Sequence, residues 1–450
     1  MIYVLLVMLL GGVSVSRADA PPVVFATNLG GEAFVAGDGT AYSAESGVVG
    51  GFVREVDVIK GSQDAALYQR MREGDFTVVH PVDAGTYDVT LHFAEPDEVR
   101  GGERVFDVLV EGEVVLRALD VMAYRDGKTN SALTITIPEV AVRDGRLEVA
   151  FDARAGRPVL SALVVREPYR PAAGEWTLRW QDEFDGDAVD DARWTAERWP
   201  ARKVNDEDQA YTQRPRNLRL EDGELVIEAH RESFEGAQYT SARLQSSGKG
   251  DFLYGRFEVR ARLPEGKGTW PAIWMLPSKP FHYATTCSDG EWQGNANCDA
   301  WPNSGEIDIM EHVGYQQGHV HGTVHNEAYY WVKWEQRKGR ILLDDVADAY
   351  HVYALEWSPE RIDAFVDDTH YFSYMNEGDG WRSWPYDQPF HLILNLAVGG
   401  VWGRAGGGID PAVFPQQMRV DYVRVYQRTG GAQPAAASLP PRTPPRASAP

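Results

Sequence analysis

Three acidic side chains stand within six residues of this chain, at Glu306, Asp308 and Glu311. Side chains of a strand alternate between its two faces, so Glu306 and Asp308 are expected on one face and the apolar residues between them on the other. A regular strand would point Glu311 into the apolar layer, where an unpaired carboxylate is costly. One extra residue, a β-bulge at Ile309 or Met310, would return Glu311 to the acidic face, and we predict such a bulge.

Carboxyl groups that share one face repel each other when ionised, and this repulsion pushes their pKa values apart. One ionised carboxylate beside one protonated acid is suited to hydrolysis of a glycosidic bond. A separation of about 5–5.5 Å suits a retaining double displacement, and one of about 6.5–9.5 Å suits an inverting reaction. The spacing in the sequence allows either. The alternative is a solvated acidic strand face without a catalytic role.

Aromatic residues are dense on both sides of these acids. Their rings pack against the C–H faces of sugars and their polar tips bind hydroxyls, so the pattern favours a groove for a polysaccharide. Some of the rings are expected in the core instead. The set comprises Trp270, Trp274 and Trp301 before the acids, and Tyr315, Tyr329, Tyr330, Trp331 and Trp334 after them.

Four further motifs flank the acids, at 254–258 (YGRFE), 270–277 (WPAIWMLP), 394–400 (LNLAVGG) and 420–426 (VDYVRVY). Family 16 glycoside hydrolases show the same motifs in the same order, and residues 175–428 resemble that family. Lichenase-like members of the family typically have one residue fewer between the aspartate and the second glutamate. The longer spacing from Asp308 to Glu311 therefore favours the laminarinase-like branch, which hydrolyses β-1,3-glucans. The resemblance implies a concanavalin-like β-jelly roll whose concave sheet carries the acids.

The resemblance also implies roles for individual residues. Glu306 would be the nucleophile, Glu311 the acid/base and Asp308 an assisting group that tunes Glu306. Substrate contacts are expected from the platforms Trp270, Trp274 and Trp402 and from the hydrogen-bonding side chains Asn217, Arg256, His325 and Asn395. The chemistry needs no cofactor, but a structural calcium ion is expected on the side opposite the acids, with Asp421 and the backbone near Glu183 and Gly223 as its candidate ligands. The loop 205–211 is more acidic than the family pattern, which leaves the outer subsites open.

The first half of the chain reads as a second all-β unit, because apolar residues alternate in several short runs separated by turns. Residues 21–167 are therefore predicted to form a β-sandwich. The motifs at 28–31, 67–69, 91–95 and 104–108 resemble malectin-type domains, which bind glucose-containing oligosaccharides. Sugar contacts are expected from Tyr42, Tyr68, Phe93 and Asp152. A domain that serves only as a spacer is the alternative.

The remaining segments set the context of the two domains. Residues 1–20 read as a signal peptide, 168–174 as a linker and 429–450 as a disordered tail rich in Pro and Ala. We therefore expect a secreted protein, extracellular or periplasmic, without a membrane association after cleavage. Export would allow the two cysteines, Cys287 and Cys298, to form a disulfide.

The composition limits the classes of molecule that the protein is expected to bind. The net charge of −22 over 450 residues argues against nucleic acid and fits a neutral polysaccharide substrate. We expect a monomeric, secreted, retaining endo-β-1,3-glucanase that hydrolyses laminarin-type glucans. The alternatives are a mixed-linkage β-1,3-1,4-glucanase and a glucan transglycosylase, followed by a galactan hydrolase. A non-catalytic glucan-binding protein is disfavoured because both glutamates are present.

Overall fold

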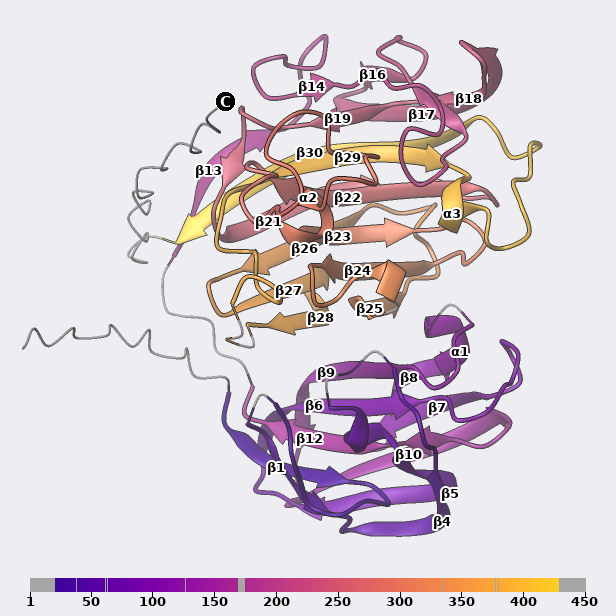
Figure 1. Ribbon diagram of the computed structural model, residues 1–450, viewed down its shortest axis with the longest axis vertical. Helices are drawn as coiled ribbons and strands as arrows, with labels where there is room; N and C mark the ends of the chain where they lie inside the picture. The colour runs from indigo at the N-terminus through magenta and orange to yellow at the C-terminus, as the bar shows by residue number, and fades with distance from the viewer. Residues whose placement is uncertain are drawn as a thin grey trace, which may run out of the picture.

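The computed structural model describes residues 21–168 and 175–428, apart from positions 38, 61, 63, 126, 334, 377 and 379. The predicted signal peptide, residues 169–174 of the predicted linker, Trp334 and the predicted tail lie outside the described residues. The described part folds around two separate hydrophobic cores, one in each half of the chain. Figure 1 shows the two domains that enclose these cores. Within the described residues, no helix has the length and apolar character needed to cross a bilayer.

The N-terminal domain is a sandwich of two sheets. One sheet has the order β2 (Phe34–Val35), β3 (Ala41–Ala44), β1 (Val23–Asn28), β12 (Ala162–Arg166), β6 (Gly85–Ala94) and β9 (Ala132–Val142). The other has the order β11 (Val159–Leu160), β5 (Arg70–Pro81), β10 (Arg146–Ala155), β7 (Val105–Val110) and β8 (Glu113–Leu119), with β4 (Val48–Glu55) paired to β5. Two short helices, η1 (Ala65–Tyr68) and α1 (Val121–Tyr124), lie in its loops.

The C-terminal domain is a larger sandwich. Its first sheet has the order β15 (Gln209–Tyr211), β18 (Ala237–Ser241), β17 (Glu224–Phe234), β30 (Gln416–Arg428), β21 (Gly255–Arg262), β26 (His351–Trp357), β27 (Arg361–Val366) and β28 (Thr369–Met375), joined by β13 (Trp176–Asp182) and β16 (Leu218–Glu221). Its second sheet has the order β14 (Thr195–Ala196), β19 (Arg243–Gln245), β29 (Phe390–Val398), β22 (Thr269–Pro277), β23 (Glu306–His312), β24 (His319–His325) and β25 (Arg337–Leu342), with β20 (Asp251–Phe252) on β29. Short helices α2 (Ala300–Asn303), η2 (Trp331–Lys333) and α3 (Gly400–Gly403) lie in loops.

Alternation of side chains explains why these strands form two layers. In β22, for example, Ile273 and Met275 are fully buried between the sheets, whereas Trp270 and Trp274 point the other way and are partly exposed. The same period places Leu392, Leu394 and Leu396 of β29 in the core. The all-β fold and the pair of sandwiches predicted from the sequence are confirmed.

The two domains touch each other. Strand β9 of the N-terminal domain lies beside β28 of the C-terminal domain, and the guanidinium of Arg340 on β25 sits 3.5 Å from the ring centroid of Tyr124 in α1. Figure 1 shows β28 and β25 at the border of the upper domain, facing β9 and α1. The N-terminal domain therefore has a contact surface on the C-terminal domain in addition to the chain connection.

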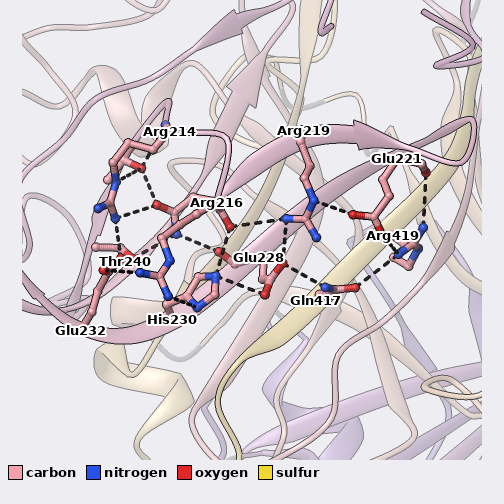
Figure 2. Close-up of polar contacts among 12 residues, drawn as sticks. Arg214, Arg216, Arg219, Glu221, Glu228, His230, Glu232, Thr240, Gln417 and Arg419 are labelled. Atoms are coloured by element: carbon pink, nitrogen blue, oxygen red, sulfur yellow. Dashed lines mark hydrogen bonds and ion pairs between the residues drawn. The ribbon is translucent and has the colours of Figure 1, made fainter. Parts of the chain in front are cut away.

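A network of ion pairs covers part of the outer face of the larger sheet, over β16, β17 and β30 (Figure 2). Arg219 bridges Glu221 and Glu228, at 2.7 Å from each. Arg419 likewise pairs with Glu221, at 3.2 Å, and with Glu224, at 2.5 Å. A shared arrangement of this kind holds the side chains in place better than isolated surface pairs do.

Loss of one bridging arginine tests this network. Replacement of Arg219 by methionine, which keeps an apolar stem, is expected to lower the free energy of unfolding by about 1 kcal/mol, because Glu228 is nearly buried and loses a charged partner. Urea denaturation measures the change, which should shrink at high salt. The control is Arg198→Met, whose pair with Glu235 is mostly exposed on both sides. Equal losses in the two variants would contradict the special role of the network.

Candidate active site

A β-bulge interrupts β23 at the predicted place. Opposite β24, Asp308 pairs with Thr323 and Glu311 pairs with His321, so three steps along β23 match two along its neighbour. Opposite β22, the pairing shifts at the same point. Ile309 and Met310 are both fully buried in the core, whereas Glu306 and Glu311 are partly exposed. The extra residue thus brings Glu311 to the face that carries Glu306, and the predicted bulge is confirmed.

The bulge is held from the opposite sheet. The hydroxyl of Tyr371 on β28 donates a hydrogen bond of 2.7 Å to the carbonyl oxygen of Ile309. A bulge leaves one residue of the strand without its regular ladder partners, and a buried carbonyl without a partner is costly. Gly322 leaves room for this contact, since a Cβ at that position would come within 2.8 Å of the Tyr371 hydroxyl. A side chain far from the acids in the sequence therefore fixes the bend that orients them.

The three acids form a strongly coupled group. Burial, followed by the nearby charge of Glu311, raises the pKa of Glu306 to about 8. Burial, followed by the charges of Glu306 and Glu311, also raises the pKa of Asp308 well above its usual range. The hydrogen bond between Asp308 and Glu306 raises the pKa of Asp308 and lowers that of Glu306. The proton between them therefore belongs on Asp308, which donates it to Glu306 and leaves Glu306 as the group that ionises first.

Two indoles donate hydrogen bonds to the first and the last of the three acids, Glu306 and Glu311. Trp301 donates from Nε1 to Glu306 at 2.8 Å, and Trp270 donates from Nε1 to Glu311 at 3.0 Å. Trp402 of α3 meets Trp270 edge to face, with 5.7 Å between the ring centroids. The predicted platforms Trp270 and Trp402 therefore stand beside Glu311, and Trp301, which lies just before the strand, stands beside Glu306.

A hydrogen-bond relay fixes the third predicted platform. Trp274 donates from Nε1 to Asn395 at 2.7 Å, Asn395 donates to the Tyr211 hydroxyl at 3.2 Å, and Tyr211 donates to Glu207 at 3.1 Å. The guanidinium of Arg243 covers the Trp274 ring at 4.8 Å from its centroid. Asn395 therefore orients the indole of Trp274, and its expected contact with the substrate stays a prediction.

His325 lies on β24 directly opposite Glu306. Its Nε2 atom is 3.5 Å from Asp308 and 3.9 Å from Glu306. Burial, helped by the charge of Lys338, lowers the pKa of His325 to about 3, so the imidazole is neutral at ordinary pH. A neutral imidazole can act as a donor or an acceptor without adding a charge to the acid group.

Two predicted substrate contacts lie elsewhere, and these predictions are wrong. Asn217 is fully buried, and its amide is occupied by Thr212, Thr240 and the carbonyl of Glu228. Arg256 lies on β21 in the other sheet, where it pairs with Glu258 and Glu356. Because Phe257 faces the core, Arg256 faces away from it, on the outside of the sheet that does not carry the acids.

Of the residues expected near a calcium ion, Asp421 pairs with Arg260 at 2.5 Å, and both carboxylate oxygens of Glu183 accept from Arg424 at 2.8 Å. These side-chain pairs do not involve the backbone near Glu183 and Gly223, from which the other ligands are expected. The calcium site therefore stays a prediction. Among the described residues, the group of metal-ligand atoms found within 4.8 Å of one another is Glu306, Asp308 and His325, which belong to the acid site itself.

In the N-terminal domain, three of the four predicted sugar contacts are interior residues. Phe93 is fully buried, and Tyr42 and Tyr68 are nearly so. The Tyr68 hydroxyl bonds to His92 at 2.8 Å and to Thr134 at 2.9 Å. The burial of these three side chains contradicts their predicted contact with a sugar, whereas Asp152 on β10 is exposed.

The structure joins Cys287 and Cys298 in a disulfide, with 5.2 Å between their Cα atoms. The bridge closes a loop that precedes α2. Asp299, which follows Cys298, accepts backbone hydrogen bonds from Thr285 and Thr286, both at 2.8 Å. The loop is thereby fastened next to Trp301 and the start of β23.

Three side chains contribute to the site although no motif marks them as functional. Trp301 is one of the aromatic residues before the acids, and its distance of five residues from Glu306 is the available signal. Arg243 covers an indole and contributes a positive charge near Glu306. Tyr371 could not be found from the sequence, because nothing in its neighbourhood indicates which carbonyl it meets.

Removal of the Tyr371 hydroxyl tests the support of the bulge. Tyr371→Phe is expected to lower the free energy of unfolding by about 1–3 kcal/mol, because the Ile309 carbonyl is left buried without its donor. Chemical denaturation measures the loss. Tyr353→Phe is the matched control, since the hydroxyl of Tyr353 is buried in the same core without a hydrogen-bond partner. A control that loses as much stability as Tyr371→Phe would refute the assignment.

The raised pKa values predict how stability depends on pH. A carboxyl whose pKa is higher in the folded than in the unfolded state stabilises the fold fully at low pH, and this contribution is lost as pH rises through the folded pKa. Glu306→Gln is therefore expected to be more stable than the wild type by roughly 4 kcal/mol at pH 8, and nearly equal to it at pH 4. Melting curves over this range measure the difference. Glu265→Gln, at an exposed position, should show no such trend, and a gain for Glu306→Gln that is independent of pH would contradict the coupling.

Comparison with known proteins agrees with this geometry. Residues 205–424 match the model of the glycosyl hydrolases family 16, and residues 23–163 match that of the malectin domain. A beta-glucanase of Rhodothermus marinus is 49% identical over 262 residues, which cover 57% of this chain and 86% of the relative.

Solved structures give the same result. The laminarinase from Rhodothermus marinus, 49% identical, covers 57% of this chain and 99% of its own, with a TM-score of 0.52. A non-specific endo-beta-1,3(4)-glucanase from family GH16, co-crystallised with 1,3-beta-D-cellotriosyl-glucose, is 39% identical and covers 58% of this chain and 98% of its own, with a TM-score of 0.51. With its bulged acidic strand and these relatives, the chain belongs to glycosyl hydrolase family 16 and carries a malectin domain ahead of the catalytic one.

Proposed function

We propose that this protein is a secreted, retaining endo-β-1,3-glucanase that hydrolyses laminarin-type glucans. The observation that carries the proposal is the bulge in β23, which turns Glu306 and Glu311 to one face beside the indoles of Trp301 and Trp270. The names of the relatives, a laminarinase among them, support β-glucan as the substrate. The apolar run and the Ala-Asp-Ala sequence in residues 1–20 support export.

In the first step, the carboxylate of Glu306 attacks the anomeric carbon while Glu311 protonates the leaving glycosidic oxygen. The bond from carbon to the leaving oxygen breaks as the ester to Glu306 forms. Asp308 supplies a hydrogen bond to Glu306, which limits its basicity and eases its later departure. The neutral His325 adds no charge to the group.

In the second step, Glu311 removes a proton from water, and the resulting nucleophile attacks the anomeric carbon from the opposite face. The ester bond breaks and Glu306 leaves as a carboxylate. Two inversions at the same carbon give net retention. A hydroxyl group of a second sugar in place of water would give a transglycosylase, so product analysis distinguishes the two: longer oligomers indicate transfer.

A mixed-linkage glucanase is the second candidate. It is favoured by the likeness to a structure described as a non-specific endo-beta-1,3(4)-glucanase. Rates on laminarin and on a mixed-linkage glucan, measured with the same preparation, decide between the two substrates.

Loss of either glutamate tests the mechanism. Glu306→Gln and Glu311→Gln are each expected to lower kcat on laminarin about 10³-fold or more while the glucan still binds, because the amide can neither form the ester nor exchange a proton. Release of reducing ends measures turnover, and affinity electrophoresis measures binding. Glu265→Gln, at an exposed site, is the control. Activity near the wild-type level in either active-site variant would refute the assignment.

Azide separates the two roles. In Glu311→Ala, azide can replace water in the second step without needing a general base, so the expected product is a β-glycosyl azide. In Glu306→Ala, azide would attack the substrate directly from the opposite face and give the α-glycosyl azide. Product NMR reads the configuration, and the reverse pattern would exchange the two assignments.

A further inference from the structure

Two hollows lie between the acid site and the junction of the domains, each of about 280 Å³. The first is bordered by Ser62 of the N-terminal domain and by Glu327 and Arg382 of the C-terminal domain. The second is bordered by the same Glu327 and Arg382, together with Tyr330 and Trp381. The two hollows share Glu327 and Arg382 as border residues and are therefore neighbours. We call them together the junction groove.

The junction groove begins one ring away from Glu306. Pro302 borders its near end and follows Trp301, whose indole donates to Glu306. Tyr330, a second border residue, meets Trp301 edge to face, with 5.6 Å between the ring centroids. The indole of Trp301 therefore stands between Glu306 and the near end of the groove.

The walls of the groove are aromatic and fixed. Trp381 is stacked on Tyr283, with 5.4 Å between the centroids and 5° between the planes. The Tyr283 hydroxyl in turn donates to Asp387 at 2.7 Å. The indole is partly exposed, and the guanidinium of Arg382 lies 4.9 Å from its ring centroid. It therefore offers aromatic surface to a sugar beside a donor for the sugar's hydroxyls.

The polar groups of the groove are paired with each other. Glu327 accepts from Arg382 at 3.2 Å and from Lys333 at 3.3 Å. Such pairs offer acceptors and donors side by side, which suits the neighbouring hydroxyls of a neutral sugar. The border residues also include the carboxylates of Glu335 and Asp299, so acids outnumber the guanidinium of Arg382 and an anionic ligand is disfavoured.

The far end of the groove is formed by the other domain. Ser62 lies in the segment between β4 and η1, and the domain that carries it is held by the contacts of β9 with β28 and of Tyr124 with Arg340. The predicted sugar contacts Tyr42, Tyr68 and Phe93 are buried. The N-terminal domain thus meets the groove through a loop.

We propose that a β-glucan chain held in the acid site continues on the Glu306 side into the junction groove, along Tyr330 and Trp381, and ends its contact with the protein at Ser62 of the N-terminal domain. This inference rests on the proposed glucanase function and extends it. The malectin domain then lengthens the substrate path of the enzyme in addition to any ligand it binds on its own.

Two substitutions in the full-length protein test the groove. Ser62→Trp fills its far end from the N-terminal domain, and Trp381→Ala removes its aromatic wall. For a β-1,3-glucan oligomer of about ten units, each substitution is expected to raise KM about 3- to 10-fold more than it does for an oligomer of about four units. The loss of one sugar contact changes affinity by about this factor. Ser46→Trp, at an exposed position in the turn between β3 and β4, is the matched control and should leave both values unchanged.

The outcomes are distinguishable. If the wild type is active and both groove variants, folded by their melting curves, keep the wild-type dependence on chain length, the groove is refuted and the glucanase function stands. If the wild type cleaves no β-glucan, the proposed function fails and the groove fails with it. A rise in KM for the long oligomer in Ser62→Trp alone supports the contact of the N-terminal domain with the substrate.

Discussion

The catalytic face of this protein depends on one extra residue in β23 and on the hydrogen bond that accommodates it. Without the bulge at Ile309 and Met310, Glu311 would point into the core that those residues now fill. The bulge frees a carbonyl oxygen in an apolar layer, and Tyr371 satisfies it from the opposite sheet. The position of an acid in one sheet is therefore set by packing between both sheets.

The site also contains buried carboxyl groups that are not matched by an equal number of buried cations. Two features of the site lower the cost of burying them. The indoles of Trp301 and Trp270 donate to the outer acids, and the proton on Asp308 removes one negative charge while it satisfies Glu306. The nearby positive charge, Arg243, is itself balanced by Glu197 at 2.5 Å. The acids are therefore contacted directly by neutral donors, and burial still keeps the pKa of Glu306 high.

The sequence predicted those features that follow from a period of two. Alternation of side chains places Glu306 and Asp308 on one face of the strand. Because Glu311 lies five residues after Glu306, an odd number, a bulge is needed to bring it to the same face. The same rule does not say which of two sheets a strand joins, and for that reason Arg256 was assigned to the wrong one, although its neighbour Phe257 correctly marks the core. Asn217 was misplaced because a buried amide and a substrate-binding amide look alike in a sequence. Tyr371 lies 62 residues from Ile309, and only the three-dimensional packing of the sheets reveals that they meet.

The acidic loop that left the outer subsites open has a structural explanation. Asp206 and Asp208 both pair with Arg404, next to α3 and its Trp402, so their charges are used to hold the loop rather than being left for the substrate. Glu207 is buried and ends the relay from Trp274 through Asn395 and Tyr211. Burial raises the pKa of Glu207, and the hydrogen bonds it accepts explain how an acid can be kept there. The additional acids, Asp206 and Asp208, therefore hold the loop beside α3, whereas Glu207 supports the Trp274 platform from behind.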